Sequence, residues 1–444
     1  MTKDMTTGNP TRLILFFSVP ILFGNLFQQF YNMMDAIIVG QCLGEDALAA
    51  VGATGSIMFL VLGFSMGIAQ GFGVMVSQVF GAGDMKRLKH VVALSFLLSL
   101  IISAVLTVIT VTASRELLIF MQTPDNILEL ADSYIKVIFY GIIASMFYNM
   151  LAAIIRGVGD SKTPLYFLIL SSILNIVLDL FFIMVLKAGV AGAAYATVLA
   201  QGISVILCLI YMYRKFKILR TGRGDYYIDL HTTIQMMKIG IPMALNYSII
   251  AIGAMILQAA VNTFGSSVVA AYTAASKVEQ ISSQALPAIG TAMSTYCGQN
   301  LGAGNYRRIF DGMRKAFFIT AVTAGISALI CIVFGKYIVA LFLDNPTEEI
   351  FNYASMYLNT ISCFFLFLGF IFLYRTSLQS LGSSTITVFS GIFEMICRIG
   401  VVWLCLKPFG YWAVCFASPI AWIGAGIPMM FAYFHWKKRH PIPA

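Results

Sequence analysis

The sequence predicts an all-α integral membrane protein with about twelve transmembrane helices, arranged as two pseudo-symmetric six-helix lobes around a central cleft. Three observations predict this fold. The composition is too apolar for a soluble chain, the basic residues are sorted into alternate connections, and the second half of the sequence repeats the first.

The composition places the chain in a lipid bilayer. Of its 444 residues, 59% are hydrophobic and 11% are charged, and the mean hydropathy is +0.87. A soluble globular chain carries about 25% charged residues, and a disordered chain is poor in apolar residues, so both classes are excluded. A helical span needs roughly 20 apolar residues, and ~35 residues for each span with its connection give about twelve spans.

Apolar runs separated by charged or turn residues mark the expected spans. Several runs are longer than a bilayer is thick, which predicts tilted helices or helices that extend beyond the membrane. The runs lie near 13–39, 47–76, 91–114, 133–155, 164–186, 190–213, 235–263, 268–297, 316–343, 350–378, 386–406 and 410–435.

The formal net charge of +9 indicates orientation rather than a nucleic-acid partner, because no basic stretch is interleaved with stacking aromatic residues. One alternating set of connections holds 20 of the 28 basic residues, and the opposite set is acidic. Basic residues collect on the cytoplasmic side, so both termini are expected in the cytoplasm and the number of spans is even. The chain is therefore expected to be a multi-pass protein of the cell membrane.

The two halves of the sequence match at a steady offset of 221 to 223 residues. The segment SQVFGAGDMKRL at 77–88 matches GQNLGAGNYRRI at 298–309, and Pro20 pairs with Pro242 at the start of a span. An even number of spans separates matched positions. The repeat is therefore parallel, and its pseudo-two-fold axis is expected along the membrane normal.

The repeat defines the expected domains. They are an N-terminal lobe at 1–213, a cytoplasmic linker at 214–233 and a C-terminal lobe at 234–444. Two parallel lobes around a cleft are an architecture of alternating-access transport, whereas a channel more often places several copies around a pore. A membrane enzyme has no need of two matched halves, and no nucleophile motif or metal cluster is visible, so an enzyme is not expected.

A polar stripe runs along the first predicted span. Asn25, Gln28, Asn32 and Asp35 are three or four residues apart and share one helix face. Asp35 follows Pro20 by ~22 Å of helical rise, which places it in the outer half of the span. A charged side chain at the bilayer centre costs a few kcal/mol, so Asp35 is a candidate functional residue.

The fifth predicted span carries a second polar face, made of Ser171, Asn175 and Asp179 at successive helical turns. Thr197 in the sixth span adds a further oxygen. Two carboxylates, an amide and a hydroxyl within one lobe can share a proton or bind a hard cation. The alternative is a structural role, in which each carboxylate is hydrogen-bonded to a hydroxyl or to backbone near a helix end.

The second half differs from the first in its charged residues. At the position that repeats Asp35 it has an apolar or neutral residue near Leu257. Glu394 and Arg398 are one turn apart and can neutralise each other, whereas Lys277 and Glu279 point to different helix faces. A buried structural network and a substrate or second coupling site both stay open. The charged residues inside the apolar runs of this half are Lys277, Glu279, Arg375, Glu394 and Arg398.

Other residues predict packing rather than chemistry. Gly63, Gly67 and Gly71 form a stripe of small residues that is typical of close helix packing. The eight cysteines form no C-x-x-C pair, and the four histidines lie in polar connections or near span ends. Neither a zinc site, a disulfide framework nor a histidine-based metal site is expected.

Four motifs carry a resemblance to a known family. They are SVPILFGNLFQQFYNMMDAIIVGQCLGEDALAAVG at 18–52, SQVFGAGD at 77–84, RGVGDSKTP at 156–164 and LNIVLD at 174–179. Together they resemble the multidrug and toxic compound extrusion (MATE) family of bacterial efflux transporters. The resemblance covers essentially the whole chain in the right order, and both halves carry the repeated pattern.

The resemblance implies an antiporter that exports organic cations in exchange for H+ or Na+, by alternating access of a V-shaped cleft. It implies a coupling ion and no cofactor, with proton uptake bending the first helix at a candidate hinge, Pro20. The residues that it assigns to H+ or Na+ coupling are Asp35, Asn175, Asp179 and Thr197. Gln28, Asn32 and Ser171 are candidate substrate or polar-stripe residues.

The sequence departs from another bacterial branch of that family, which has acidic residues in the seventh and tenth spans. Here the seventh span has none around Ile250, and the tenth carries Arg375, so a sodium site in the second lobe is not expected. The expected partners are amphipathic cationic small molecules and the bilayer, and the expected state is a monomer. An alternative function, a lipid-linked precursor flippase, would use a basic cleft for a pyrophosphate headgroup; Lys277, Arg375 and Arg398 favour it.

Overall fold

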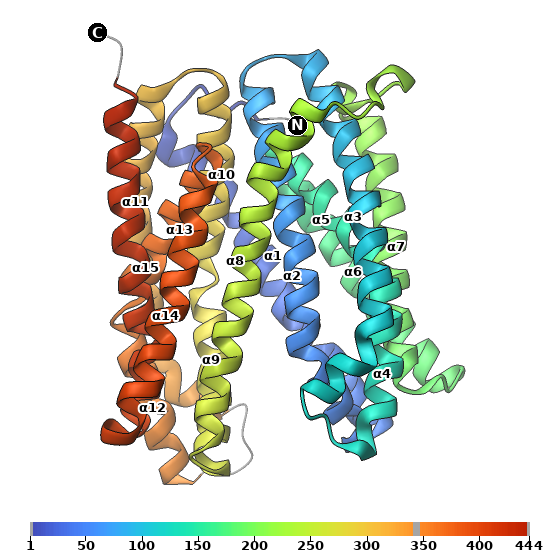
Figure 1. Ribbon diagram of the computed structural model, residues 1–444, viewed down its shortest axis with the longest axis vertical. Helices are drawn as coiled ribbons and strands as arrows, with labels where there is room; N and C mark the ends of the chain where they lie inside the picture. The colour runs from blue at the N-terminus through green and yellow to red at the C-terminus, as the bar shows by residue number, and fades with distance from the viewer. Residues whose placement is uncertain (1–2, 341–346, 442–444) are drawn as a thin grey trace. The chain divides into compact units, whose positions relative to one another are not determined.

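Helices joined by short connections make up the computed structural model, which describes residues 3–340 and 347–441 (Figure 1). No strand occurs within these ranges. The helices are α1 (Pro10–Leu43), α2 (Glu45–Gly81), α3 (Met85–Phe120), α4 (Asp125–Tyr140), α5 (Ile142–Gly157), α6 (Lys162–Leu180), α7 (Gly189–Lys215), α8 (Leu230–Asn262), α9 (Ser266–Ser283), α10 (Ala285–Gly302), α11 (Tyr306–Ala340), α12 (Glu348–Ser362), α13 (Phe365–Ser380), α14 (Ser384–Phe409) and α15 (Tyr411–Arg439). A π-helical turn, η1 (Phe181–Val185), extends α6, and the short 3-10 turns η2 (Lys217–Leu219) and η3 (Arg223–Asp225) precede α8.

Most of these helices are long and apolar enough to cross a bilayer. Among the described residues nine helices meet this criterion, and eleven spans result if each of two bent pairs counts as one. The remaining predicted run, 268–297, corresponds to α9 and α10, which do not meet the criterion; α9 contains Lys277 and Glu279, and α10 contains Gln299 and Asn300. The predicted all-α membrane fold is confirmed, with nine to eleven spans by this criterion against about twelve expected.

The two bent pairs occupy equivalent places in the two halves. The axes of α4 and α5 differ by 47° across Gly141, and those of α12 and α13 differ by 49°. A side chain at position 141 would overlap the side chain of Val198 on α7, so the bend brings this backbone into close contact with its neighbour. The equivalent predicted runs 133–155 and 350–378 are therefore each broken into two helices at a bend.

The chain packs as two compact units. The first part of α1 belongs to the unit of the second half, and the first part of α8 belongs to the unit of the first half. The N unit comprises Met1–Asp4 and Phe23–Ser248, and the C unit comprises Met5–Leu22 and Ile249–Ala444. The sequence repeat places the division at the linker 214–233. The packing instead divides α1 after Leu22 and α8 after Ser248.

Apolar contacts explain why the segment Met5–Leu22 belongs to the C unit. Ile14 and Phe17 are buried in one hydrophobic cluster with Met293 and Tyr296 of α10. The backbone amide of Met5 also donates a hydrogen bond to Gln299 Oε1 at 2.8 Å. The sequence period identifies both helices but carries no signal for which half their first turns contact.

Small residues explain why the first part of α8 belongs to the N unit. A Cβ at Gly67 would overlap the backbone of Ala244, and one at Gly71 would overlap the backbone of Gly240. The glycine stripe of α2 therefore lies directly against α8, as its spacing predicts. Ala244 is fully buried in the same cluster as the residues of α2 and α3.

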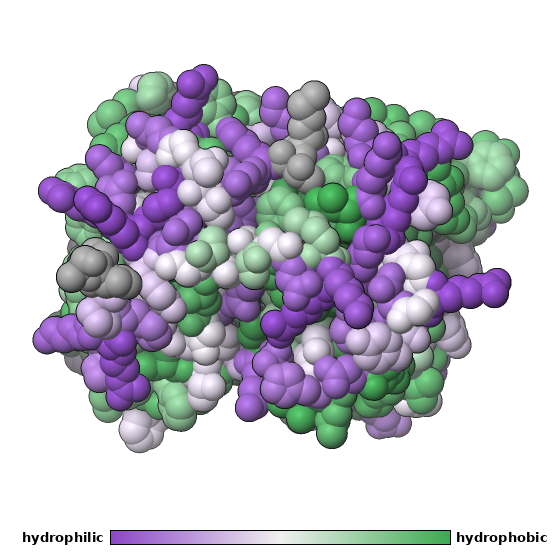
Figure 2. Space-filling view, turned by 90° about the horizontal axis from the view of Figure 1, so that it is seen from above, coloured by the Kyte–Doolittle hydropathy of each residue, from purple (hydrophilic) through white to green (hydrophobic). Residues whose placement is uncertain are grey.

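The outer surfaces of the units carry large apolar side chains, as expected for helices that face lipid. Val108 on α3 is 65% exposed, and Trp403 on α14 is 82% exposed. Seen from above, hydrophilic side chains gather at this end of the helices, and hydrophobic residues show around the margin (Figure 2).

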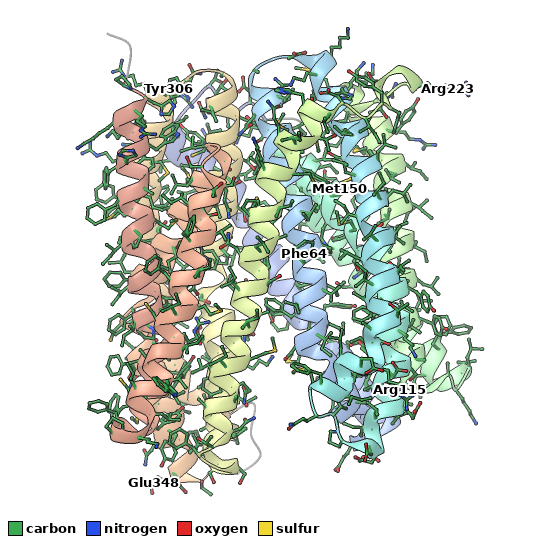
Figure 3. All side chains as sticks on the ribbon, viewed as in Figure 1. Phe64, Arg115, Met150, Arg223, Tyr306 and Glu348 are labelled. Carbon is green, nitrogen blue, oxygen red and sulfur yellow. The ribbon has the colours of Figure 1, made fainter. Side chains whose placement is uncertain are left out.

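The ends of each unit are polar. In the N unit, Arg223 of the basic linker and Arg115 lie at opposite ends, with Phe64 and Met150 between them (Figure 3). Arg115 pairs with Glu129 at 2.8 Å on the surface. In the C unit, Tyr306 and Glu348 lie at opposite ends (Figure 3).

Candidate functional site

Three helices of the N unit bring the predicted coupling residues together. Asp35 comes from α1, Asn175 and Asp179 from successive turns of α6, and Thr197 from α7. Asn175 and Asp179 are buried, with 1% and 0% of their surfaces exposed, whereas Asp35 and Thr197 are half-buried. The i, i+4 spacing on α6 points both polar side chains at α1 and α7. The predicted cluster therefore exists as a spatial site.

The two carboxyl groups of this site are in direct contact. Asp35 and Asp179 lie within hydrogen-bonding reach of each other. The Oδ1 atom of each is buried without a donor from the described residues. No lysine or arginine in the described chain forms an ion pair with either carboxylate. Two carboxyl groups in contact need a shared proton or a bound cation between them.

Asn175 links the carboxylates to α7. With its amide nitrogen facing Asp179, Asn175 donates to Asp179 Oδ2 at 2.8 Å. Its amide oxygen then accepts from the hydroxyl and the backbone amide of Thr197, both at 3.2 Å. This orientation satisfies donors and acceptors together, so Asn175 holds Asp179 in a fixed position while leaving its Oδ1 free.

Two tyrosines complete the site, and the sequence analysis did not identify them. The Tyr31 hydroxyl donates to Thr197 Oγ1 at 3.4 Å. Tyr134 on α4 is 3% exposed and lies within electrostatic range of both aspartates. A signal for each was present, because Tyr31 is one turn from Asp35 and Tyr134 is repeated as Tyr357 in the second half.

The helix that carries Asn175 and Asp179 changes its winding directly after them. The α-helix α6 ends at Leu180 and continues as the π-helical turn η1. A π turn loosens the regular backbone hydrogen bonding, and such turns frequently occur at functional sites. The carboxylate of Asp179 therefore stands next to the least regular part of its helix.

The other predicted polar residues of the N unit lie on the same two helices as the carboxylate pair. Gln28 donates to Asn32 Oδ1 at 3.4 Å along α1, and Asn32 is exposed. Ser171 is 8% exposed and lies one turn before Asn175 on α6. These three residues extend the polar surface of α1 and α6 without joining the hydrogen bonds around the aspartates that are described above.

The charged residues of the C unit form an ion-pair network. Glu394 contacts Arg375 at 2.7 Å and Arg398 at 3.4 Å, and all three side chains are buried. Glu279 accepts a hydrogen bond from Tyr357 at 2.7 Å and lies within electrostatic range of Arg398. Four of the five charged residues predicted for this half are therefore close together.

Lys277 does not join that network. Its side chain is exposed, and it forms no ion pair with the described residues. Lys277 and Glu279 point to different faces of α9, as their two-residue spacing predicts.

The oxygen atoms of the N unit suit a proton or a monovalent cation better than a multivalent metal. The described residues contain no group of three or more His, Cys, Asp or Glu side chains that could hold a metal ion. The available oxygens come from two carboxylates, one hydroxyl and one amide. Hard cations such as Na+ are bound through such oxygens. If the two carboxylates keep one proton between them, the remaining single negative charge is neutralised by one further proton or one monovalent cation.

A family model identifies the same two halves as the repeat. The MatE model matches residues 20–181 and again 242–404, so it covers well over half of the chain. The probable multidrug resistance protein YpnP of Bacillus subtilis (strain 168) is 31% identical over 384 residues, covering 86% of this chain and 84% of that protein. The multidrug export protein MepA of Staphylococcus haemolyticus is 22% identical, covering 96% of this chain and 94% of that protein.

Solved structures share the fold. An outward-facing multidrug resistance MATE family transporter of the MOP superfamily has a TM-score of 0.90 and 24% identity, covering 98% of this chain and 97% of that one. A crystal structure of a MATE protein in complex with MaL6 has a TM-score of 0.91 and 23% identity, covering 98% of both chains. At these identities the likeness concerns the fold alone.

Proposed function

Because the chain belongs to the MATE family of multidrug efflux transporters, we propose that it exports organic cations across the cell membrane in exchange for H+ or Na+. In this proposal the Asp35–Asp179 pair is the coupling site, with Asn175 and Thr197 as its supporting ligands. Both termini face the cytoplasm in the proposed orientation, and the substrates are amphipathic cations.

One observation carries the assignment of the coupling site. Two carboxyl groups from different helices meet inside the N unit, with no cation beside them in the described chain. A buried pair of this kind is stable only when a proton or cation is present. The site can therefore exist in two states of different charge, which is what an ion-coupled transporter requires.

The geometry suggests how binding is linked to movement. Loss of the proton or cation leaves two negative charges in contact, and their repulsion separates α1 from α6. Asn175 holds Asp179 through its hydrogen bond, so α1 is the element that moves. Pro20 removes one backbone hydrogen bond within α1, which lowers the cost of bending that helix.

The coupling role is tested by removing one carboxylate. Asp35→Asn keeps the size of the side chain but cannot alternate between charge states, so it should abolish drug resistance conferred on a sensitive host. Asp132→Asn is the matched control, because Asp132 is also a buried carboxylate of the N unit but pairs with Lys136 at 2.6 Å. Efflux by Asp35→Asn at the wild-type level, at equal membrane abundance, would contradict the assignment.

The coupling ion is identified in proteoliposomes. Uptake of a fluorescent cation is measured with a proton gradient alone and with a sodium gradient alone. If only one gradient drives uptake of the cation, that gradient identifies the coupling ion. If neither gradient drives uptake, the result contradicts antiport. Uptake of an organic cation also separates this proposal from the flippase alternative, which the multidrug transporters among the relatives do not favour.

A further inference from the structure

The internal repeat relates the coupling helix α6 to α14 residue by residue. The two matches of the family model end at 181 and 404, which are 223 residues apart. Gly159 and Gly382, in the turns just before the two helices, have the same separation and both adopt positive φ. In this register Asn175 corresponds to Arg398, and Asp179 corresponds to Val402.

The positions of Asn175 and Arg398 are alike in burial and differ in charge. Asn175 is 1% exposed, and Arg398 is 7% exposed. Both aspartates of the N unit are replaced by apolar residues, because Asp35 corresponds to Leu257 at the offset of 222 that relates Pro20 to Pro242. Where the N unit has two carboxylates and an amide, the C unit has a guanidinium group.

The first helix of the C-unit repeat leaves room for this guanidinium. Tyr31 of α1 corresponds to Gly253 of α8. A Cβ at position 253 would lie 2.5 Å from Arg398 Nη1, so the arginine rests against bare backbone. The residue types at these two positions differ together between the units. The N unit has a tyrosine and an asparagine, and the C unit has a glycine and an arginine.

The charges around Arg398 balance within the C unit. Arg375 and Arg398 share Glu394, and Glu279 is the second carboxylate within range. Two guanidinium groups thus face two carboxylates. The other ionisable side chains nearby are the phenols of Tyr272 and Tyr357. The N-unit site has two carboxylates in contact and no guanidinium or ammonium group paired with them in the described chain.

We propose that Arg398 is a fixed positive charge that takes the place of the coupling cation in the C unit, where it pairs with Glu394, and that ion coupling is confined to the N unit. The inference rests on the proposed function, because it takes the Asp35–Asp179 pair as the site that binds the ion. It assigns Arg398 the role of a fixed charge within the C unit and limits the number of ions that are coupled to each transport cycle. Each transport cycle changes the charge of one unit only.

The test counts protons bound by purified protein in detergent. A pH-indicator dye measures uptake when the pH falls from about 8 to about 5, a range that spans ordinary carboxyl and imidazole groups. Arg398→Asn removes the fixed cation and should take up about one proton more than wild type, because a carboxylate of the network loses its partner. Arg398→Lys keeps the charge and should match wild type. Arg398→Asn/Glu394→Gln restores the charge balance and should lose the additional proton.

The same measurement in a second background separates the two proposals. Asp35→Asn/Asp179→Asn removes the N-unit site, and Arg398→Asn should still add its proton there. If Arg398→Asn adds none in either background, the role of Arg398 is overturned. If Asp35→Asn/Asp179→Asn takes up as many protons as wild type in sodium-free buffer and binds Na+ as well as wild type, the proposed coupling site fails instead.

A reciprocal variant keeps the inference falsifiable if Arg398→Asn does not fold as a monodisperse protein. Asn175→Arg places in the N unit the residue found at the matched position of the C unit. It should bind one proton or Na+ fewer than wild type, because the guanidinium group replaces one of the cations that the two carboxylates need. Binding at the wild-type level by a folded Asn175→Arg protein would contradict the idea that an arginine at this position replaces the ion.

Discussion

The helices α6 and α14 are repeats of one another, yet α6 carries an amide and a carboxylate where α14 carries a guanidinium group and a valine. At matched positions both helices bury Ser171 and Glu394, and Asn175 and Arg398. The repeated fold thus provides two equivalent interior positions, and the side chains decide which one needs a mobile ion. The Asp35–Asp179 pair has no arginine or lysine in an ion pair with it in the described chain, whereas the matched position of the C unit holds Arg398, which pairs with Glu394.

Giving the N-unit site the arginine of the C unit should have the largest effect on transport. Asn175→Arg puts a permanent cation beside Asp179 and should lower ion-driven transport by at least about 100-fold, because a fixed charge removes the differential ion binding that drives the change of state. Initial rates of drug uptake into proteoliposomes measure this effect. Asn175→Gln is the control for size without charge, and equal loss in both variants would show that charge is not the cause.

Removing a charge should affect the stability of the two units differently. Arg375→Met leaves Glu394 with only its 3.4 Å contact to Arg398, and breaking a buried pair in this way costs about 3–5 kcal/mol of unfolding free energy. Asp179→Asn removes one of two like charges and should leave the melting temperature unchanged or higher. Thermal unfolding in detergent compares the variants, and equal destabilisation would contradict the difference between the units.

Space around the fixed cation can be tested at Gly253. Gly253→Ala places a methyl group 2.5 Å from Arg398 Nη1, so the end of the arginine side chain must shift, and the variant should lose about 1 kcal/mol, the low end of overpacking costs. Gly400→Ala is the matched control, because a Cβ at this position of α14 meets nothing within 4 Å. The difference in melting temperature between the two variants measures the clash. A Gly253→Ala protein as stable as Gly400→Ala would place Arg398 elsewhere.

The smallest expected difference concerns the starts of the first helices of the two halves. Asn9 Oδ1 accepts from the Arg12 amide before α1, while Asp229 Oδ2 accepts from the Thr232 amide before α8. Hydrogen bonds from Thr232 hold the pKa of Asp229 below its usual value of 3.8. The contribution of this cap is present above that value and is lost as the pH falls through the lowered pKa.

The consequence is a small pH dependence that only one cap should show. Asp229→Asn should flatten part of the acid side of the melting-temperature profile, and Asn9→Asp should steepen it. Melting temperatures recorded between about pH 3 and about pH 6 compare the variants with wild type, in the range of ordinary carboxyl groups. An unchanged profile in Asp229→Asn would mean that the cap does not contribute to stability.

Helical spacing predicted the core of the candidate site. Asp35, Asn175 and Asp179 lie on helix faces that period and polarity identify, and Thr197 was a candidate further oxygen from the next span. The structure brings all four together. Tyr134 was not predicted because a tyrosine near a helix end also suits an apolar core. Its position depends on the bend between α4 and α5, which no residue pattern places in space.

The sequence also does not predict that the first parts of α1 and α8 each pack with the other half. The repeat correctly relates α1 to α8, but repeats report likeness and carry no information on contact. Close approach of α8 to α2 depends on the glycines at 67 and 71, whose partners on α8 are equally small. The stripe predicted a close contact without naming the helix that makes it.

The exchanged segment Met5–Leu22 sets an order for folding during synthesis. Met5 is hydrogen-bonded to Gln299, which lies 294 residues later in the chain. At roughly 5–20 residues per second, the ribosome needs roughly 15 to 60 s to produce that partner. Through this interval the first part of α1 has none of its final neighbours from α10. Residues made before the rest of the N-terminal half are therefore among the last to reach their final contacts, and neither sequence repeat alone contains all residues of one unit.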